Sequence, residues 1–191
     1  MDNSPNLMAV DWTAIPPPHD DGAARHLAGQ TLPSLALPAT DRSNINLAEL
    51  PGRTVVFVFP KTGKPGTPLP VGWDSIPGAR GCTPQSCAFR DHFAELIGAG
   101  AAHVFGLSAQ DTDYQREAAG RLHLPFALLS DTELKFTSAL KLPIFVAEGR
   151  TLLKRITMVA DRGRITKVFY PVFPPDQNAR TVLNWLKDNP V

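Results

Sequence analysis

The sequence predicts an α/β fold with a central mixed sheet flanked by helices. Apolar runs typical of buried strands alternate with segments of helical period from residue 53 onward, and a hairpin pattern and a helix close the chain. Alternation of this kind places parallel strands in the middle of a sheet, and the hairpin adds antiparallel strands at one side. The length of 191 residues suits one core, and 43% hydrophobic against 19% charged residues is typical of a folded chain.

The individual elements follow from the apolar period and from the residues that end each run. Arg53 to Phe59 is rich in β-branched and aromatic residues and stops at Pro60, which predicts a buried strand. After Cys82 the apolar residues recur at helical spacing as far as Ile97, and Gly98 closes a single predicted helix. The same reasoning predicts strands over 103–108 and 126–129, helices over 111–122, 131–140 and 176–187, and a hairpin of residues 152–160 and 164–170.

Prolines and glycines mark two irregular segments. Three consecutive prolines at 16–18 indicate an extended N-terminal arm over residues 1–22, which docks on a single domain of residues 23–191. Five more prolines are interleaved with glycines over residues 60–81 and exclude regular helix or strand there. A loop of this length in a compact domain is usually functional. We therefore expect it to influence Cys82, which follows it, and Trp73 within it to cover a site or contact a partner.

The charge balance and the cysteine content limit the kinds of partner. Lys and Arg number 19 and Asp and Glu 18, so no basic field recruits nucleic acid or an anionic membrane. No apolar run approaches the roughly 20 residues that span a bilayer. The first residues lack the features of a signal peptide, so we expect a cytoplasmic protein. In that reducing compartment a cysteine pair is more often redox-active or metal-binding than structural.

Both cysteines lie in the string GCTPQSCAFRD, which opens the predicted helix after the loop. Pro84 suits a first helical turn and Thr83 is a reasonable cap, so Cys82 lies at or just before the helix N-terminus. The free N–H groups and the helix dipole at such a terminus stabilise negative charge. This position therefore favours the reactive thiolate form of Cys82.

Cys87 lies five residues further along the same helix. In an intact helix the two Cα atoms are roughly 8 to 9 Å apart, beyond the limit of about 7 Å for a disulfide. A disulfide therefore requires the first turn to unwind, and the pair is either a redox switch or two unrelated thiols, one capping and one buried. A zinc site is disfavoured, because His92 is the only histidine on this segment.

The string GCTPQSCAFRD, preceded by the strand VVFVFP, closely resembles the bacterioferritin-comigratory-protein (PrxQ) branch of the peroxiredoxins, from about Ala28 to the C-terminus. The resemblance implies a thioredoxin-like fold in which Cys82 is the peroxidatic cysteine and Cys87 the resolving one. It also assigns Pro60 to the family's strand-end proline and Arg155, in the context Arg-x-Thr, to the arginine of a late strand.

Two departures from the family pattern concern the approach to Cys82. A longer segment than usual intervenes between Pro60 and the cysteine, and the position three residues before Cys82 is Ala79 instead of the family's threonine. That threonine's hydroxyl hydrogen-bonds the thiolate or the peroxide in the family, so a substitute is expected from the inserted segment or nearby. The candidates are Ser75, Arg80 and Thr83.

Arg155 also stands out without the resemblance. It interrupts an apolar run from Leu152 to Val159, where an unpaired charge is costly to bury. A thiolate is a fitting partner for such a guanidinium. The alternatives are a carboxylate partner or an arginine that snorkels at a strand end.

The leading hypothesis is a thiol-dependent peroxidase that reduces hydrogen peroxide and organic hydroperoxides through a Cys82 sulfenic acid and a Cys82–Cys87 disulfide. A thioredoxin- or glutaredoxin-like reductant would recycle the enzyme, a monomer or weak homodimer that needs no metal or organic cofactor. Two alternatives stay open. One is a redox sensor or interaction module of the same fold without turnover. The other is a thiol–disulfide oxidoreductase, whose usual CxxC pattern differs from the CxxxxC found here.

Overall fold

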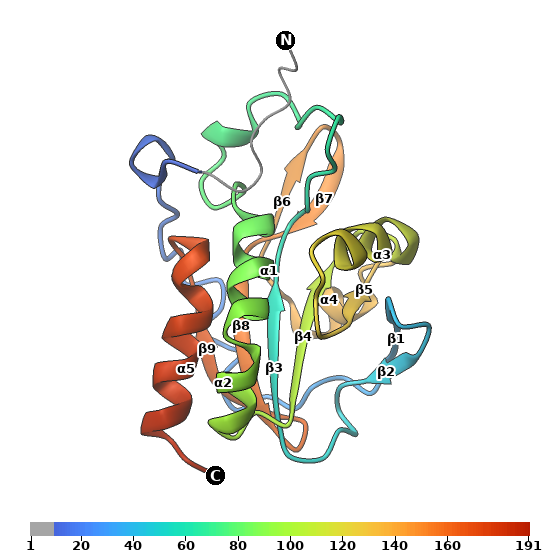
Figure 1. The fold of residues 1–191 in the computed structure, drawn as a ribbon, viewed down its shortest axis with the longest axis vertical. Coiled ribbons are helices and arrows are strands. Elements are labelled where there is room, and N and C mark those ends of the chain that lie inside the picture. The colour runs from blue at the N-terminus through green and yellow to red at the C-terminus, as the bar shows by residue number, and fades with distance from the viewer. Residues whose placement is uncertain (1–9) are drawn as a thin grey trace.

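A five-stranded mixed sheet forms the centre of the computed structural model, which describes residues 10–191 (Figure 1). The strand order is β5-β4-β3-β8-β9. Strands β3, β4 and β5 are parallel to one another, β8 is antiparallel to β3, and β9 is antiparallel to β8. This confirms the predicted mixed sheet. The strands are β3 (Arg53–Val58), β4 (His103–Ser108), β5 (Leu128–Ser130), β8 (Ile156–Asp161) and β9 (Arg164–Phe169).

Helices cover both faces of the sheet because β3 is apolar on both sides. Val55 and Phe57 pack under one group of helices, whereas Val56 and Val58 pack against the opposite layer. The first layer consists of α1 (Cys82–Asp91), α2 (Phe93–Gly98) and α5 (Asn178–Asp188), and the second contains α4 (Lys135–Leu140). Helix α3 (Thr112–Arg121) lies beside β5 at the edge of the sheet (Figure 1).

Two aspartates show how local sequence starts helices in this fold. The Asp111 carboxylate accepts a hydrogen bond from the N–H of Tyr114 at 2.8 Å and caps α3, as predicted. The Asp131 carboxylate accepts bonds from the N–H groups of Phe136 and Thr137 at 3.1 and 2.8 Å. Helix α4 therefore begins at Lys135, four residues later than the sequence predicts, because Asp131 caps it from a distance.

Two predictions of single elements were wrong, and some short strands were not predicted. The helix expected from Cys82 to Gly98 is divided at His92, whose ψ of 7° departs from the α-helical value. The strand expected over 152–160 is two strands, because the chain turns away between β7 (Arg150–Leu153) and β8. Strand β7 instead pairs with β6 (Ile144–Ala147) in a separate hairpin, and β1 (Ala36–Pro38) pairs with β2 (Asn44–Asn46), strands that the apolar pattern did not indicate.

The predicted hairpin turn between β8 and β9 is confirmed. Arg162 and Gly163 both have positive φ, 45° and 77°, as a two-residue hairpin turn of this hand requires. A Cβ on Gly163 would lie 2.4 Å from the carbonyl oxygen of Ala48, so the turn requires glycine for its packing as well. Pairing in this hairpin sets the position of β8, whose first residue directly follows Arg155.

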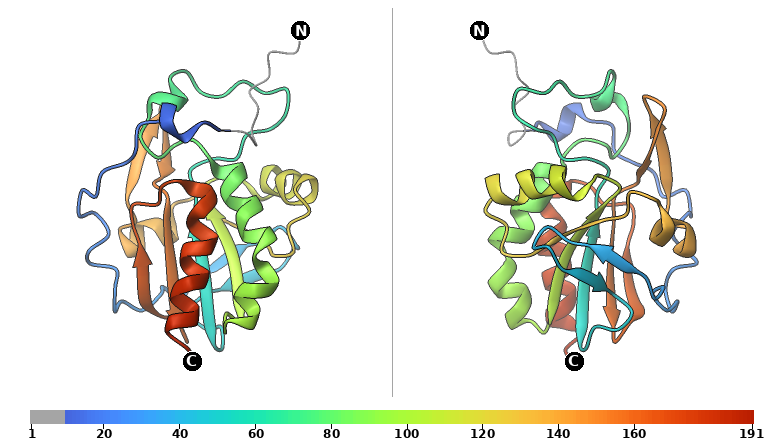
Figure 2. Two further views of the ribbon diagram at one scale, coloured as in Figure 1. Left: turned by 60° about the vertical axis from the view of Figure 1, so that its left-hand side comes forward. Right: turned by 90° about the vertical axis from the view of Figure 1, so that its right-hand side faces the viewer.

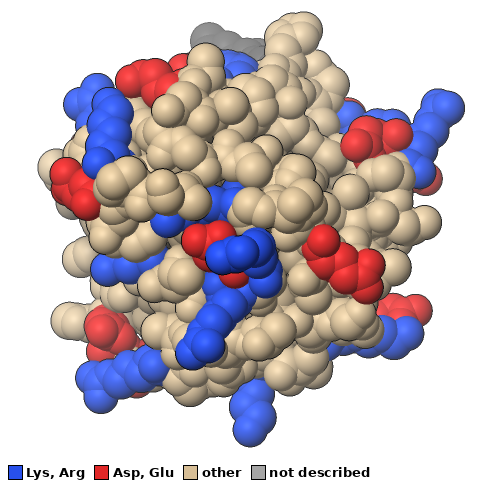
Figure 3. Space-filling view, turned by 90° about the horizontal axis from the view of Figure 1, so that it is seen from below, with Lys and Arg blue, Asp and Glu red and all other residues tan. Residues whose placement is uncertain are grey.

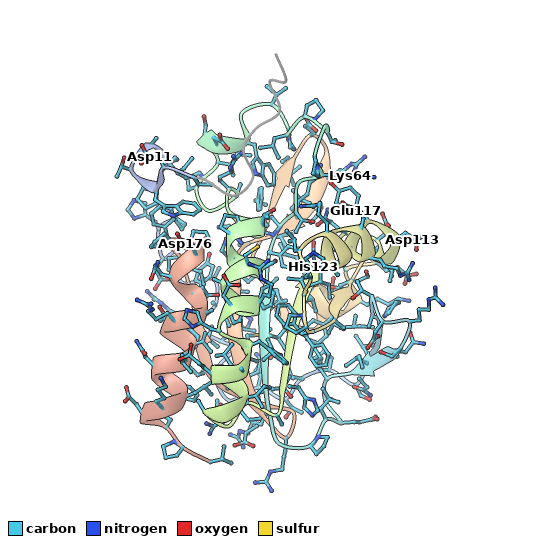
Figure 4. All side chains as sticks on the ribbon, viewed as in Figure 1. Asp11, Lys64, Asp113, Glu117, His123 and Asp176 are labelled. Carbon is cyan, nitrogen blue, oxygen red and sulfur yellow. The ribbon has the colours of Figure 1, made fainter. Side chains whose placement is uncertain are left out.

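The segment of residues 10–22 runs along the outside of the molecule and reaches the end where the inserted segment lies (Figure 2). Its only helical turn is Trp12–Ala14, and the Trp12 indole donates to the Asp176 carboxylate at 2.8 Å. Asp11 and Asp176 accordingly lie on the same side of the molecule in Figure 4. Further along, Asp21 accepts hydrogen bonds from Lys154 at 2.6 Å and from the Tyr170 hydroxyl at 2.8 Å. Residues 1–9 of the predicted arm lie outside the described part of the chain.

The surface carries both signs of charge. On the end of the molecule viewed in Figure 3, Lys and Arg side chains are interspersed with Asp and Glu. Among the described residues, no helix has the length and apolar character needed to cross a bilayer.

Candidate active site

Cys82 is the first residue of α1, at the end of the sheet where β3 stops (Figure 1). Gly81 precedes it in the left-handed conformation with φ of 104°, and its carbonyl accepts the first helical bond, from Gln85 N at 3.0 Å. The predicted position of Cys82 at the helix N-terminus is therefore present in the structure. Thr83 is not the cap, because the helix starts one residue before it and Thr83 lies within the first turn.

The Cys82 thiol lies between one donor and one acceptor. The Nη2 of Arg155 is 3.2 Å from Sγ, and the carbonyl oxygen of Ala79 is 3.7 Å from it. A protonated thiol can donate to that carbonyl, whereas a thiolate accepts from the guanidinium. Because the cysteine and the arginine are only 3% exposed, this charge-assisted contact is formed away from water.

Arg155 lies in the break between β7 and β8 and points into the site. Its Nη2 also donates to the carbonyls of Gly78, Ala79 and Arg80, the last three residues before Gly81, at 3.4, 3.1 and 3.1 Å. The guanidinium therefore fastens the end of the inserted segment and contacts the thiol with the same nitrogen.

The second guanidinium nitrogen binds a residue that the sequence analysis did not single out. Arg155 Nη1 donates to Oε1 of Gln85, which is fully buried on the first turn of α1. The sequence carries one weak signal for Gln85. It is a polar residue one turn from Cys82, where an inward-facing side chain meets the same surroundings as the thiol.

Cys87 is buried on the same helix, and the two cysteines do not form a disulfide. Burial raises the pKa of the Cys87 thiol, and the positive charges of Arg90 and Arg121 partly offset that rise. The intact helix holds the two cysteines on different turns, so the described state is the reduced one, and a disulfide needs this segment to unwind.

The inserted segment, residues 61–81, covers the thiol. It contains one helical turn, Trp73–Ser75, and is otherwise irregular, as the prolines predict. The cavity beside Cys82 has a volume of about 10 Å³, and this volume is at the lower limit for a single water molecule. The segment contributes most of the lining, which consists of Lys61, Gly63, Leu69, Trp73, Arg80, Gly81, Cys82, Thr83 and Pro84.

The lining of this cavity shows which of the three candidates for the family's threonine lie near the thiol. Thr83 and Arg80 line it, whereas Ser75 is exposed and does not. The Arg80 guanidinium also lies 3.3 Å from the carboxylate of Asp74. Of the three predicted substitutes, two are therefore close to the thiol, while the Cys82 sulfur itself is hydrogen-bonded to Arg155 and to the Ala79 carbonyl.

The inserted segment contacts the rest of the protein at both ends and in the middle. Trp73, only 3% exposed, packs with Phe145 of β6 and Leu152 of β7. Near its start, the carbonyl of Gly63 accepts a hydrogen bond from Arg121 of α3 at 3.0 Å. In Figure 4 the neighbouring Lys64 accordingly lies close to α3 and its Glu117.

Pro60 is buried immediately after β3, where its carbonyl accepts a hydrogen bond from the Ser108 hydroxyl at 3.1 Å. It is not among the residues that line the cavity at Cys82, whereas its neighbour Lys61 is. The structure therefore brings Cys82 and Arg155 into contact, with Cys87 on the same helix and Pro60 at the adjoining strand end. Within residues 10–191, no group of three or more His, Cys, Asp and Glu side chains could hold a metal ion.

Comparison with known proteins agrees with this geometry. The family model Redoxin matches residues 27–183. Peroxiredoxin Bcp of Escherichia coli is 30% identical over 85% of this chain and 96% of its own length. The chloroplastic peroxiredoxin Q of Gentiana triflora is 30% identical over 92% of this chain and 76% of its own length. The crystal structure of peroxidoxin BcpB from Mycobacterium tuberculosis superposes with a TM-score of 0.68 at 23% identity, covering 86% of this chain and 98% of that one.

The match to the Redoxin model over residues 27–183 places the chain in the Redoxin family, and the mixed sheet with a cysteine at the start of α1 agrees with it. Within that family it is a peroxiredoxin of the Q/Bcp group, and its activity is that of a thiol-dependent peroxidase. Peroxiredoxins of this kind act on peroxides and are recycled by thioredoxin-type reductants.

Proposed function

We propose that Cys82 is the peroxidatic cysteine and Cys87 the resolving one. The Cys82 thiolate attacks one oxygen of the peroxide, the O–O bond breaks, and the other oxygen leaves as water or an alcohol after taking a proton. The Cys87 thiolate then attacks the sulfur of the Cys82 sulfenic acid, the S–O bond breaks, and the hydroxide leaves as water after taking a proton as the disulfide forms. The 3.2 Å contact between Arg155 and the Cys82 sulfur, at a helix N-terminus, is the observation that supports this assignment.

Arg155 would act on both sides of the first step. Its guanidinium stabilises the attacking thiolate, and the same positive charge favours the negative charge that develops on the departing oxygen. The resemblance to the family gives Pro60 the role of shielding the sulfur from water. Its burial beside Lys61, which lines the cavity, supports that role.

Reduction of the disulfide would use a thioredoxin- or glutaredoxin-like dithiol, and the substrates would be hydrogen peroxide and organic hydroperoxides. Two cysteines that share one helix without a disulfide suit a reducing compartment such as the cytoplasm. We also propose a monomer or weak homodimer, in which residues 1–22 form an arm on a domain of residues 23–191. The contacts of Trp12 and Asp21 with the rest of the chain support this division.

Peroxide consumption with a dithiol reductant tests the assignment, run beside Cys82→Ser and Cys87→Ser. The wild type should turn over, Cys82→Ser should lose all peroxide consumption, and Cys87→Ser should stop after one oxidation with a trappable sulfenic acid. Both variants replace a buried sulfur by an oxygen of similar size, so circular dichroism should be unchanged. Turnover that survives in Cys82→Ser would refute the assignment.

The small cavity at Cys82 also supports a second candidate, a redox sensor of the same fold without efficient turnover. A thiol covered by the inserted segment meets peroxide only when that segment moves. A sensor would be oxidised once by peroxide and recycled poorly by every dithiol, whereas the peroxidase recycles with a suitable one. The same consumption experiment therefore distinguishes the two.

A further inference from the structure

A buried chain of hydrogen bonds continues from the active-site arginine to helix α5. Gln85, which accepts from Arg155, donates through Nε2 to Oδ1 of Asn178 at 2.9 Å. The Thr157 hydroxyl donates to the same Asn178 oxygen at 2.7 Å. Gln85 and Thr157 are completely buried and Asn178 is 4% exposed, so water does not compete for these bonds.

The chemistry of arginine fixes the direction of every bond in this chain. A guanidinium has only donors, so Gln85 must turn its amide oxygen toward Arg155. Its amide nitrogen then faces Asn178, which must in turn present its own oxygen. Since an amide oxygen has two lone pairs, the Asn178 oxygen can also accept the Thr157 hydroxyl.

The reverse orientation of Asn178 would put two NH₂ groups opposite each other. Its amide nitrogen would face the amide nitrogen of Gln85, and the buried donor left without an acceptor would be costly. If the Gln85 amide also turned, its NH₂ group would face the guanidinium of Arg155, and two donors would again lie opposite each other. The orientation of the Asn178 amide therefore determines whether Gln85 presents its oxygen to Arg155.

We propose that Asn178 is a positioning residue of the peroxidase reaction. It touches neither the sulfur nor the substrate. By holding the amide of Gln85, it fixes Nη1 of Arg155 and so leaves Nη2 directed at the Cys82 sulfur. The inference rests on the assignment of Cys82 and Cys87 proposed above.

The same contact has a second consequence, because Gln85 lies between the two cysteines. Disulfide formation requires residues 82–87 to unwind, and unwinding removes Gln85 from Asn178. Asn178 therefore stabilises the helical, reduced arrangement. Its loss should affect the two chemical steps in opposite directions, slowing the attack on peroxide and speeding the formation of the disulfide.

Single-turnover oxidation of the full chain, with reduced protein mixed with excess hydrogen peroxide, separates the two steps. In Asn178→Leu, which keeps the branched side-chain shape without hydrogen bonding, oxidation of Cys82 should slow by up to about tenfold, the scale of one lost hydrogen bond between neutral groups. Disulfide formation should become faster than in the wild type. Equal rates in both proteins, or a loss of both rates together, would overturn the proposal.

Two further variants separate positioning from general stability. Asn178→Asp keeps an oxygen for both donors, so its oxidation rate should lie closer to the wild type than to Asn178→Leu. Val182→Ala, one turn along α5 and fully buried, should lower the melting temperature without changing the ratio of the two rates. If Val182→Ala changes the ratio as Asn178→Leu does, the effect is structural and the proposal fails.

Thr157→Val supplies an independent test should Asn178→Leu not fold. It removes one of the two donors that hold the Asn178 oxygen and keeps the side-chain shape, so both rates should change in the same directions by less. An unchanged ratio in Thr157→Val would contradict the proposal. Failure of the proposed function itself looks different, because the wild type would then show no oxidation of Cys82 at all.

Discussion

The two cysteines lie on one short helix but in different surroundings. Cys82 has a guanidinium at 3.2 Å and the first-turn N–H groups beside it, whereas Cys87 is enclosed one turn later. Burial raises the pKa of the Cys87 thiol in the helix, which favours its protonated form there. The two thiols therefore differ in their surroundings, as the separate roles proposed for them require.

Disulfide formation should therefore become faster as the pH rises through the ordinary range of a thiol, near about 8.5. Above that value Cys87 ionises in the unwound segment but stays protonated in the helix, so rising pH favours the unwound form. Disulfide formation in single-turnover experiments at several pH values measures this. Cys87→Ser, which carries out only the first step, supplies the control, and a pH-independent rate would contradict the expectation.

At the scale of elements, the inserted segment and the β6–β7 hairpin form a cover over the start of α1. Trp73 is the largest side chain of this cover and packs on Phe145 and Leu152, both contributed by the hairpin. The cover leaves a cavity of about 10 Å³ at the sulfur, so we expect the entry of a peroxide to require a shift of the segment. Access to Cys82 thus depends on the packing of residues remote from the chemistry.

Trp73→Ala should open the site. Removing a buried tryptophan costs about 3 to 5 kcal/mol of packing, and here the loss falls on the cover and not on the central sheet. Alkylation of Cys82 by iodoacetamide and its oxidation by a bulky organic hydroperoxide should both become faster, with a smaller change for hydrogen peroxide.

Trp185→Ala is the matched control for the loss of a tryptophan. Trp185 lies on α5 against Phe169 and Arg53, away from the cover. It should lower the melting temperature without changing the accessibility of Cys82. If Trp73→Ala leaves both rates of Cys82 at the wild-type value, the inserted segment does not control entry.

At the scale of the whole molecule, residues 10–22 tie the start of the chain to the active-site end. Trp12 packs against Gly81, where a Cβ would lie only 2.6 Å from the indole, and it bonds Asp176 before α5. Asp21 binds Lys154, the neighbour of Arg155, and Tyr170 after β9. Two distant points of the first segment thus contact the neighbours of Cys82 and Arg155.

The attachment at Asp21 should weaken in acid. Hydrogen bonds from Lys154 and then Tyr170 hold the pKa of Asp21 far below its ordinary value of about 3.9. Its stabilisation is therefore present above that pH and is lost as the pH falls below it. Thermal unfolding should show Asp21→Asn less stable than the wild type by at most about 1 kcal/mol at neutral pH, because the pair is partly exposed.

That difference in stability should vanish in acid and shrink in high salt. Asp20→Asn is the control, because the Asp20 carboxylate accepts only from the backbone of Gly22 in the described structure. A difference between Asp21→Asn and the wild type that persists unchanged in acid would show that the ion pair is not its source.

Much of this architecture is readable from local sequence. The strand at 53–58, the hairpin turn at Arg162 and Gly163, and the helix that begins at Cys82 all follow from patterns within about ten residues. Errors arose where a distant partner decided the local structure. The chain breaks between β7 and β8 because Arg155 turns into the site and β7 pairs with β6, which an apolar run does not encode.

The sequence by itself therefore determined the class of fold, the helix terminus that favours a thiolate, and the spacing that prevents a disulfide in the intact helix, because each depends on backbone geometry over a few residues. Only the tertiary structure decided which groups meet the sulfur. Arg155 lies 73 residues from Cys82, and Asn178 lies 93 residues from Gln85. Sheet register and helix packing bring such residues together, and no local pattern records the distance between them.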